Sequence, residues 1–122
     1  MWIGKTFTFE AAHHLPGHPK CGKVHGHTYK LTVSIKGEPI KGMVVDFSIL
    51  KEVVMKEVRE LDHTDLNLID PFPTVETLVS IILKKLVGAL TWKDLPLYLI
   101  RGVRVRLQEG EGGWAEEEDI WI

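Results

Sequence analysis

The chain has one cysteine, no long uninterrupted apolar run and almost no net charge, and each shortage excludes a class of protein. Cys21 cannot form an internal disulfide, so an oxidising compartment is not implied. A formal charge of -2 gives no electrostatic reason to bind nucleic acid or a membrane surface. The apolar stretch near residues 81–90 is interrupted by Lys84 and Lys85, and the opening MWIGKTFTFE lacks the apolar run of a signal peptide. We therefore expect a cytoplasmic protein with no nucleic-acid or membrane partner.

The length of the chain limits the number of domains. A chain of 122 residues can bury one sizeable core but hardly two, so residues 1–122 are expected to form a single domain. Its composition, 44% hydrophobic and 26% charged, is ordinary for a globular domain and leaves the function to be found in local motifs.

Alternating apolar and polar residues predict two strands at the start of the chain. The first runs from about Ile3 to His14 and the second from His25 to about Lys36, with a Pro- and Gly-containing loop over residues 15–24 between them. One face of the second strand is polar throughout. That face is consistent either with a solvated sheet face or with the lining of a wet barrel formed with neighbouring subunits.

Helical spacing of apolar residues predicts two helices after these strands. Asp46 is the expected N-cap of a helix that continues to about Leu61. A loop over residues 62–73 follows, and Thr74 is the expected N-cap of a second helix that ends near Ala89.

Two further strands complete the pattern, one from about Leu97 to Glu109 and one from Trp114 to Ile122. The acidic run 116–119 in the last strand is typical of an exposed edge protected from aggregation. The order strand, strand, helix, helix, strand, strand indicates an α+β fold, in which a four-stranded antiparallel sheet carries both helices on one face.

Histidine is concentrated in one short stretch at the end of the first strand and the start of the second. Antiparallel pairing of these strands would bring His13 beside His25 and His27, which lie on one strand face roughly 6.6 Å apart along the strand. Three imidazoles that leave a fourth position open are typical of a catalytic zinc site. The adjacent His14 points to the opposite strand face, so the alternation selects His13 as the ligand.

Cys21 lies between these histidines, close to Lys20 and Lys23, and has three possible roles. Nearby positive charge lowers the pKa of a thiol, so Cys21 is a candidate base or nucleophile. It could instead be a fourth zinc ligand, which would make the site closed and structural. It could also be a small residue that only fills a gap.

Four acidic positions, one histidine and one threonine later in the chain are further candidates. Asp62 and His63 could form an acid-base pair or could only tie down their loop, and Asp65 could orient His63 in place of Asp62. Glu109 ends an apolar strand face, where a carboxylate needs a partner or turns toward water. In the PTVET segment, helix capping and the helix dipole already explain Thr74 and Glu76.

The segment FEAAHHLPGHPKCGKVHGH resembles the zinc-binding opening of the 6-pyruvoyl-tetrahydropterin synthase family. Its Cys-x-x-x-His-Gly-His spacing is similar to the 6-carboxytetrahydropterin synthase branch. The resemblance continues through GMVVDFSILK, LDHTDLN, PTVETL and the late strand that carries Glu109. It implies the tunnelling fold, in which sheets from several subunits join into a barrel, and hence a homo-oligomer, typically a hexamer of two trimers.

The resemblance also implies a reaction. A zinc lyase of this branch would convert 7,8-dihydroneopterin triphosphate to 6-carboxytetrahydropterin with release of acetaldehyde and triphosphate, a step toward queuosine or archaeosine. The implied residues are zinc ligands His13, His25 and His27; the base Cys21; the proton-relay pair Asp62 and His63 of a neighbouring subunit; the pterin-gripping Glu109; and Thr74 and Glu76 near the pterin pocket. Gly110 departs from the polar residue usual in relatives, which leaves Glu111 as an alternative to Glu109. The nearest candidates for the triphosphate are His18, Lys20 and Lys23.

Two alternatives to this reaction stay open. The first is 6-pyruvoyltetrahydropterin synthesis, which eliminates triphosphate but keeps the carbon atoms of the side chain. The second is a non-catalytic pterin-binding or assembly module in which Cys21 closes the zinc site. A zinc hydrolase is less favoured because no carboxylate lies near the ligands in sequence to serve as an obvious general base.

Overall fold

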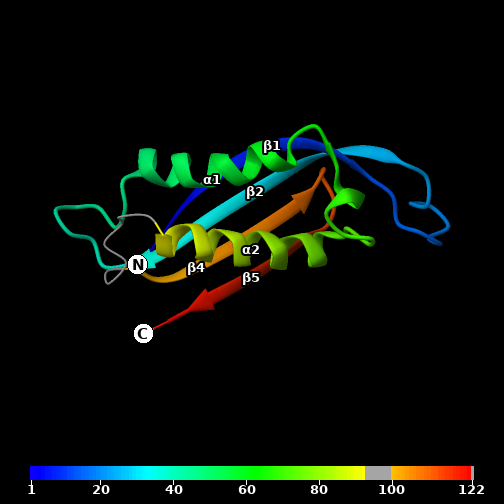
Figure 1. Cartoon of the computed structure of the whole chain (residues 1–122). Helices are drawn as coiled ribbons and strands as arrows, with labels where there is room; N and C mark the ends of the chain where they lie inside the picture. The colour runs from blue at the N-terminus through cyan, green and yellow to red at the C-terminus, as the bar shows by residue number, and fades with distance from the viewer. Residues whose placement is uncertain (93–99, 122) are drawn as a thin grey trace.

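The computed structural model describes residues 1–92 and 100–121, which form one sheet with two helices packed on a single face (Figure 1). Two predicted boundaries, the strand start at Leu97 and the strand end at Ile122, lie outside the described residues. The elements in chain order are β1 (Trp2–His13), β2 (His25–Gly37), α1 (Phe47–Leu61), β3 (Thr64–Asp65), the 3-10 helix η1 (Leu66–Leu68), α2 (Val75–Trp92), β4 (Ile100–Glu109) and β5 (Trp114–Ile120).

The sheet has five strands in the order β3-β1-β2-β4-β5. The four long strands pair antiparallel as predicted, but β3 adds a short parallel pairing in which Ala11 lies opposite Thr64. The predicted four-stranded sheet was therefore wrong by one strand, and the predicted loop over residues 62–73 contains β3 and η1. A strand of two residues is too short to show the alternation that reveals a strand in sequence.

The core lies between the sheet and the helices. Along β2, the buried side chains Tyr29, Leu31, Val33 and Ile35 alternate with exposed or half-buried polar ones, as the two-residue period requires. Helix α1 packs beside β1, while α2 packs on β4 and β5.

Both predicted helix N-caps are present. The Asp46 carboxylate accepts a hydrogen bond from the Ser48 backbone N–H at 2.8 Å, and this bond together with one from the Ser48 hydroxyl lowers the pKa of Asp46. The Thr74 hydroxyl oxygen accepts from the Thr77 N–H at 3.2 Å. Helix α2 continues to Trp92, three residues beyond the predicted end at Ala89.

The face of the sheet opposite the helices carries polar and charged side chains. Arg104 donates to the Glu118 carboxylate at 2.8 and 2.9 Å and lies over the Trp2 ring, with its guanidinium carbon 4.1 Å from the ring centroid. β5 is an edge strand, and its acidic residues are exposed, as predicted. Neither helix in residues 1–92 and 100–121 combines the length and apolarity needed to cross a bilayer.

Candidate metal and acid-base site

The register of β1 and β2 brings three histidines together. His13 lies opposite His25, and Ala11 lies opposite His27, so all three imidazoles project from the same end of the strand pair. One ring nitrogen from each residue falls within 4.8 Å of the others. The ring centroids are 4.7 to 5.1 Å apart and the rings meet edge to face. The alternation in the sequence thus predicted the grouping of His13, His25 and His27 that the structure displays.

Backbone carbonyls fix the orientation of two of these rings. His13 Nδ1 lies 2.9 Å from the carbonyl oxygen of Pro73, and His25 Nδ1 lies 2.7 Å from the carbonyl oxygen of Lys23. Because a carbonyl can only accept, each Nδ1 carries the proton and donates it. The Nε2 lone pairs of His13 and His25 are left available for a cation. This pairing of a ring N–H with a carbonyl is the usual support for a metal-binding histidine.

The surroundings also favour the neutral form of the His27 imidazole. Burial lowers the pKa of His27, and the neighbouring His13 and His25 lower it further, while the Glu109 carboxylate opposes them. A neutral imidazole is the form that binds a metal. Burial, followed by the charge of Glu109, raises the pKa of the adjacent Tyr29, which therefore keeps its proton.

The three histidines fit a divalent cation. His13 is only 1% exposed, and the Nε2 atoms of His13 and His27 are buried without a hydrogen-bond partner of good geometry. A buried nitrogen without a partner is costly, and a bound cation would satisfy both atoms. Three neutral imidazoles without a thiolate match the ligand set of catalytic zinc sites.

Glu109 lies beside this group. Its carboxylate oxygens are 3.1 Å from His27 Nε2 and 3.9 Å from His13 Nε2, and its side chain is 29% exposed. Glu111, the sequence alternative, lies in the turn after β4 and lines a different depression, together with Lys30. Of these two carboxylates, Glu109 is the one placed to reach a molecule bound at the histidines.

Cys21 lies in the loop between β1 and β2, half-buried and with a free thiol. The group of clustered ligand atoms found in the described part of the chain contains the three histidines and not Cys21. This geometry does not support the alternative in which Cys21 closes the metal site.

Asp62 and His63 form the expected pair. His63 Nδ1 lies 3.0 Å from Asp62 Oδ2, while Asp62 Oδ1 accepts from the Glu10 N–H at 2.9 Å. The Glu10 bond and the His63 bond hold the pKa of Asp62 below its usual range. Asp65 instead accepts from the Asn67 N–H at 3.0 Å and caps η1. The sequence left the choice of aspartate open, and in the structure Asp62 contacts His63.

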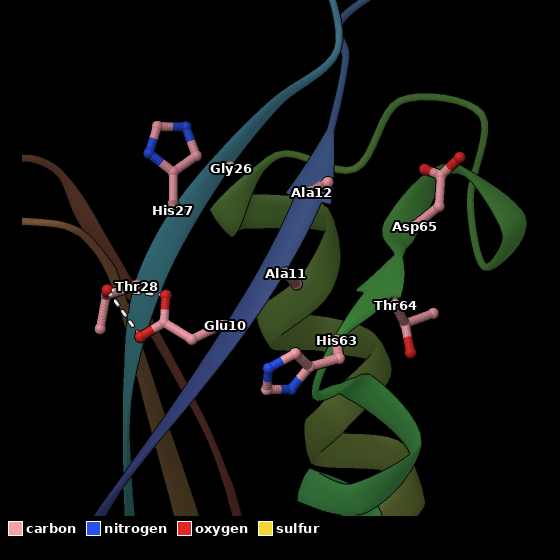
Figure 2. Close-up of a pocket in the computed structure, with 9 residues that line it drawn as sticks. All are labelled: Glu10, Ala11, Ala12, Gly26, His27, Thr28, His63, Thr64 and Asp65. Atoms are coloured by element: carbon pink, nitrogen blue, oxygen red, sulfur yellow. Dashed lines mark hydrogen bonds between the residues drawn. The ribbon is translucent and has the colours of Figure 1, made fainter.

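A depression of about 480 Å³ lies where His63 approaches the β1–β2 strand pair. Figure 2 shows Glu10 reaching across to Thr28 and the His63 ring lying next to β1, with Asp65 well separated from that ring. His27 also lines this depression, so it adjoins one of the three clustered histidines. His63 is 78% exposed and adopts a left-handed backbone conformation, with φ 57°.

The structure adds two groups that the sequence analysis did not single out. The Asn67 side-chain amide accepts from the His14 N–H at 2.9 Å and donates to the His14 carbonyl at 2.9 Å. These two bonds bind the His14 backbone just beyond the residues of β1 that pair with β3. Pro73 supplies the carbonyl that holds His13. The Asn in LDHTDLN was a visible signal, whereas a carbonyl contact leaves no trace in sequence.

The remaining predicted residues lie around this centre with different roles. Thr74 follows Pro73 and caps α2, and Glu76 is exposed in the first turn of that helix. The His14 ring is outside the group of three, and its Nδ1 is buried without a hydrogen-bond partner.

Comparisons with known proteins agree with this geometry. Residues 2–119 match the sequence model of the 6-pyruvoyl tetrahydropterin synthase family. A protein of Archaeoglobus fulgidus with the provisional name 6-carboxy-5,6,7,8-tetrahydropterin synthase is 44% identical over 95% of this chain and 94% of its own. A dihydroneopterin monophosphate aldolase of Pyrococcus furiosus is 41% identical over 75% of this chain and 82% of its own. The solved structure of Plasmodium falciparum 6-pyruvoyl tetrahydropterin synthase superposes with a TM-score of 0.80 at 20% identity, covering 98% of each chain.

Proposed function

Because this chain belongs to the 6-pyruvoyl tetrahydropterin synthase family, we propose that it is a zinc-dependent lyase that acts on 7,8-dihydroneopterin triphosphate. The proposed products are 6-carboxy-5,6,7,8-tetrahydropterin, acetaldehyde and triphosphate, in the cytoplasmic route to 7-deazaguanine nucleosides. The Cys-x-x-x-His-Gly-His spacing and the 44% identity to the Archaeoglobus fulgidus relative favour this product over a pyruvoyl pterin.

One observation carries the zinc assignment: three imidazole nitrogens lie within 4.8 Å of one another. The Nδ1 protons of His13 and His25 are directed to carbonyl groups, which leaves Nε2 of each ring for the cation. Zinc bound by His13, His25 and His27 would supply Lewis acidity at the side-chain hydroxyls of the substrate.

The proton-transfer roles belong to residues of the chain. We assign the general base to the Cys21 thiol and the return of the proton to His63, which Asp62 orients through the 3.0 Å contact. The pair suits this role because a carboxylate that stays ionised stabilises an imidazolium. The 78% exposure of His63 leaves it accessible to a group from another molecule.

Glu109 is proposed to bind the pterin ring. Its carboxylate can accept two parallel hydrogen bonds from the ring N–H and the adjacent amino group of a pterin. Its position 3.1 Å from His27 would place the pterin side chain over the three imidazoles. Thr74 and Glu76 at the start of α2 are assigned to the border of the same pocket.

The proposed assembly is a hexamer of two trimers, in which His63 of one subunit serves Cys21 of its neighbour. One feature supports it. The helix-free face of the sheet is polar, as expected for the lining of a wet barrel formed with neighbouring subunits. Sedimentation of the protein gives the subunit number directly.

The test is to incubate zinc-loaded protein with 7,8-dihydroneopterin triphosphate and to identify the products by mass spectrometry. Carboxypterin plus acetaldehyde supports the proposal, whereas a pyruvoyl product moves the chain to the sister activity. The Cys21→Ala variant is the matched control. It should retain zinc and the fold and lose turnover, while the reading of Cys21 as a structural ligand requires weaker zinc binding.

A second activity is favoured by one comparison, the 41% identity to the Pyrococcus furiosus dihydroneopterin monophosphate aldolase. An aldolase would cleave the side chain of dihydroneopterin monophosphate without eliminating triphosphate. Parallel incubations with the monophosphate and the triphosphate separate the two activities, because only the true substrate is consumed at catalytic protein concentrations.

A further inference from the structure

The loop between β1 and β2 holds Cys21 with little help from the hydrophobic core. Residues 16–20 are all exposed, and the Cys21 side chain is only half-buried. An exposed segment of this kind keeps one conformation only if its polar groups bond to one another. The hydrogen bonds within the loop therefore decide where the thiol lies.

Two backbone hydrogen bonds close the loop. The Leu15 N–H donates to the Cys21 carbonyl at 2.7 Å, and the His18 N–H donates to the Leu15 carbonyl at 3.0 Å. The chain also approaches itself at Gly22, where a Cβ atom would lie 2.8 Å from the His18 carbonyl oxygen. The loop is thus a compact ring joined at Leu15 and Cys21.

The His18 side chain supplies the next two bonds. Its Nδ1 atom lies 2.9 Å from the Cys21 backbone nitrogen and 3.2 Å from the Lys20 backbone nitrogen. Both backbone groups are donors, so Nδ1 accepts and the ring is neutral with its proton on Nε2. Pro19 has no N–H, which makes these the first two amides after His18 that can reach the ring.

We propose that His18 is a positioning residue for Cys21. Its Nδ1 atom holds the Cys21 N–H, and the Leu15 N–H holds the Cys21 carbonyl, so the Cys21 backbone is fixed on both sides of its α-carbon. The direction of the thiol follows from that constraint. The proposal rests on the function proposed for Cys21, because positioning matters for turnover only if the thiol reacts.

This role differs from binding the substrate and from holding the metal. The three clustered histidines project from the paired strands β1 and β2, and the one loop contact described for them, from the Lys23 carbonyl to His25, lies outside the ring closed between Leu15 and Cys21. Loss of the His18 acceptor should therefore reduce the turnover number while zinc content and KM change little. A residue that merely bound triphosphate would raise KM instead.

Two substitutions distinguish an acceptor at Nδ1 from a residue that only fills space. In His18→Asn the amide oxygen occupies nearly the position of Nδ1, and an Asn at this place can accept from the N–H groups two and three residues later. In His18→Gln the oxygen lies one bond farther out, near the position of Nε2. His18→Ala removes the acceptor altogether.

We expect the highest turnover number in wild type, the next in His18→Asn, and the lowest in His18→Gln and His18→Ala. The turnover number of His18→Asn should lie within about threefold of the wild-type value. The turnover numbers of His18→Gln and His18→Ala should lie on the order of tenfold below it, as expected for the loss of one to two net hydrogen bonds. Equal turnover in the Ala and wild-type proteins, or in the Asn and Gln proteins, would overturn the proposal.

A second readout does not depend on the substrate. Cys21 is the only cysteine, so its alkylation by iodoacetamide reports on this loop alone, and amide hydrogen exchange reports on the Lys20 and Cys21 N–H groups. Hydrogen exchange at the Lys20 and Cys21 amides should be faster in His18→Ala and His18→Gln than in wild type, and unchanged in His18→Asn. If the wild-type protein does not convert the substrate but the exchange rates follow this pattern, the proposed function is wrong and the contact between His18 and the two amides is still supported. Unchanged exchange in all three variants would refute the contact itself.

Discussion

The Nδ1 atom of His13 lies 2.9 Å from the carbonyl oxygen of Pro73, a residue sixty positions later in the chain. The same segment, residues 62–73, also pairs with β1 through β3, holds the His14 backbone through Asn67 and carries the Asp62–His63 pair. One loop thus fixes a candidate metal ligand and presents the candidate acid-base residues. Its buried Leu66, fully shielded from solvent, anchors it to the core.

Replacing Asn67 by Ala should weaken metal binding without removing a ligand. The substitution deletes the hydrogen bonds to the N–H and the carbonyl of His14, the residue next to His13. Because Asn67 supports a neighbour of the ligand and not the ligand itself, the loss of affinity should be smaller than the roughly 10- to 100-fold typical of losing a partner bonded directly to a ligand. Competition with a fluorescent zinc chelator measures the change. Asn67→Asp is the matched control, because it keeps the acceptor for the His14 N–H and should lose less affinity than Ala.

Replacing His27 by Ala should reduce zinc affinity by more than the Asn67 substitution, on the order of 100-fold or beyond, because it removes a ligand rather than its support. His14→Ala is the comparison, since the His14 ring lies outside the group of three. Zinc content after dialysis should stay at one equivalent in His14→Ala and fall in His27→Ala. Equal losses in the two variants would contradict the assignment.

Replacing Asp62 by Asn should change the acid stability of the protein in a defined pH range. Hydrogen bonds from Glu10 and His63 lower the pKa of Asp62 in the folded state, so the ionised carboxylate favours folding. This contribution is fully present above the unfolded pKa of about 3.9 and is lost as the pH falls through the folded pKa. The difference in Tm between wild type and Asp62→Asn should shrink as the pH falls below about pH 4. A difference that grows toward low pH would have the wrong sign.

Replacing Gly110 by Ala should destabilise the fold through its backbone alone. Gly110 has φ 56°, and a Cβ atom there would meet nothing within 4 Å. The left-handed conformation costs an L-residue roughly 1 to 2 kcal/mol, so Ala should lower the free energy of unfolding by about that amount. Chemical denaturation measures it. Gly110→Asn should cost less, since Asn tolerates this conformation better.

Much of the fold was predictable because its long elements are periodic. The alternation in β1 and β2 set both the strand positions and the face that carries His13, His25 and His27. The N-caps Asp46 and Thr74 were visible as residue types at the start of apolar helical patterns. These features depend on local sequence patterns, in which a residue type at a given position favours one local structure.

Other features of the site depended on contacts between distant segments. Nothing in the sequence distinguishes Asp62 from Asp65 as the partner of His63, because both are within two residues of it. The structure decides through the Glu10 N–H, which holds Asp62, and the Asn67 N–H, which holds Asp65. The carbonyl of Pro73 and the acceptor role of His18 were likewise invisible, since backbone partners have no residue signature.

The left-handed backbone conformation of His63 is unfavourable for a histidine, while the proposed activity requires a histidine at this position. Glycine or asparagine would adopt φ 57° with less strain, so replacing His63 by either relieves strain but removes the Asp62 contact and the candidate proton carrier. Populations selected for product should keep histidine at position 63 despite its strained backbone, whereas populations that no longer need the proton carrier should admit glycine or asparagine there. The conformation of one residue thus predicts how the chain would diverge under two different selection pressures.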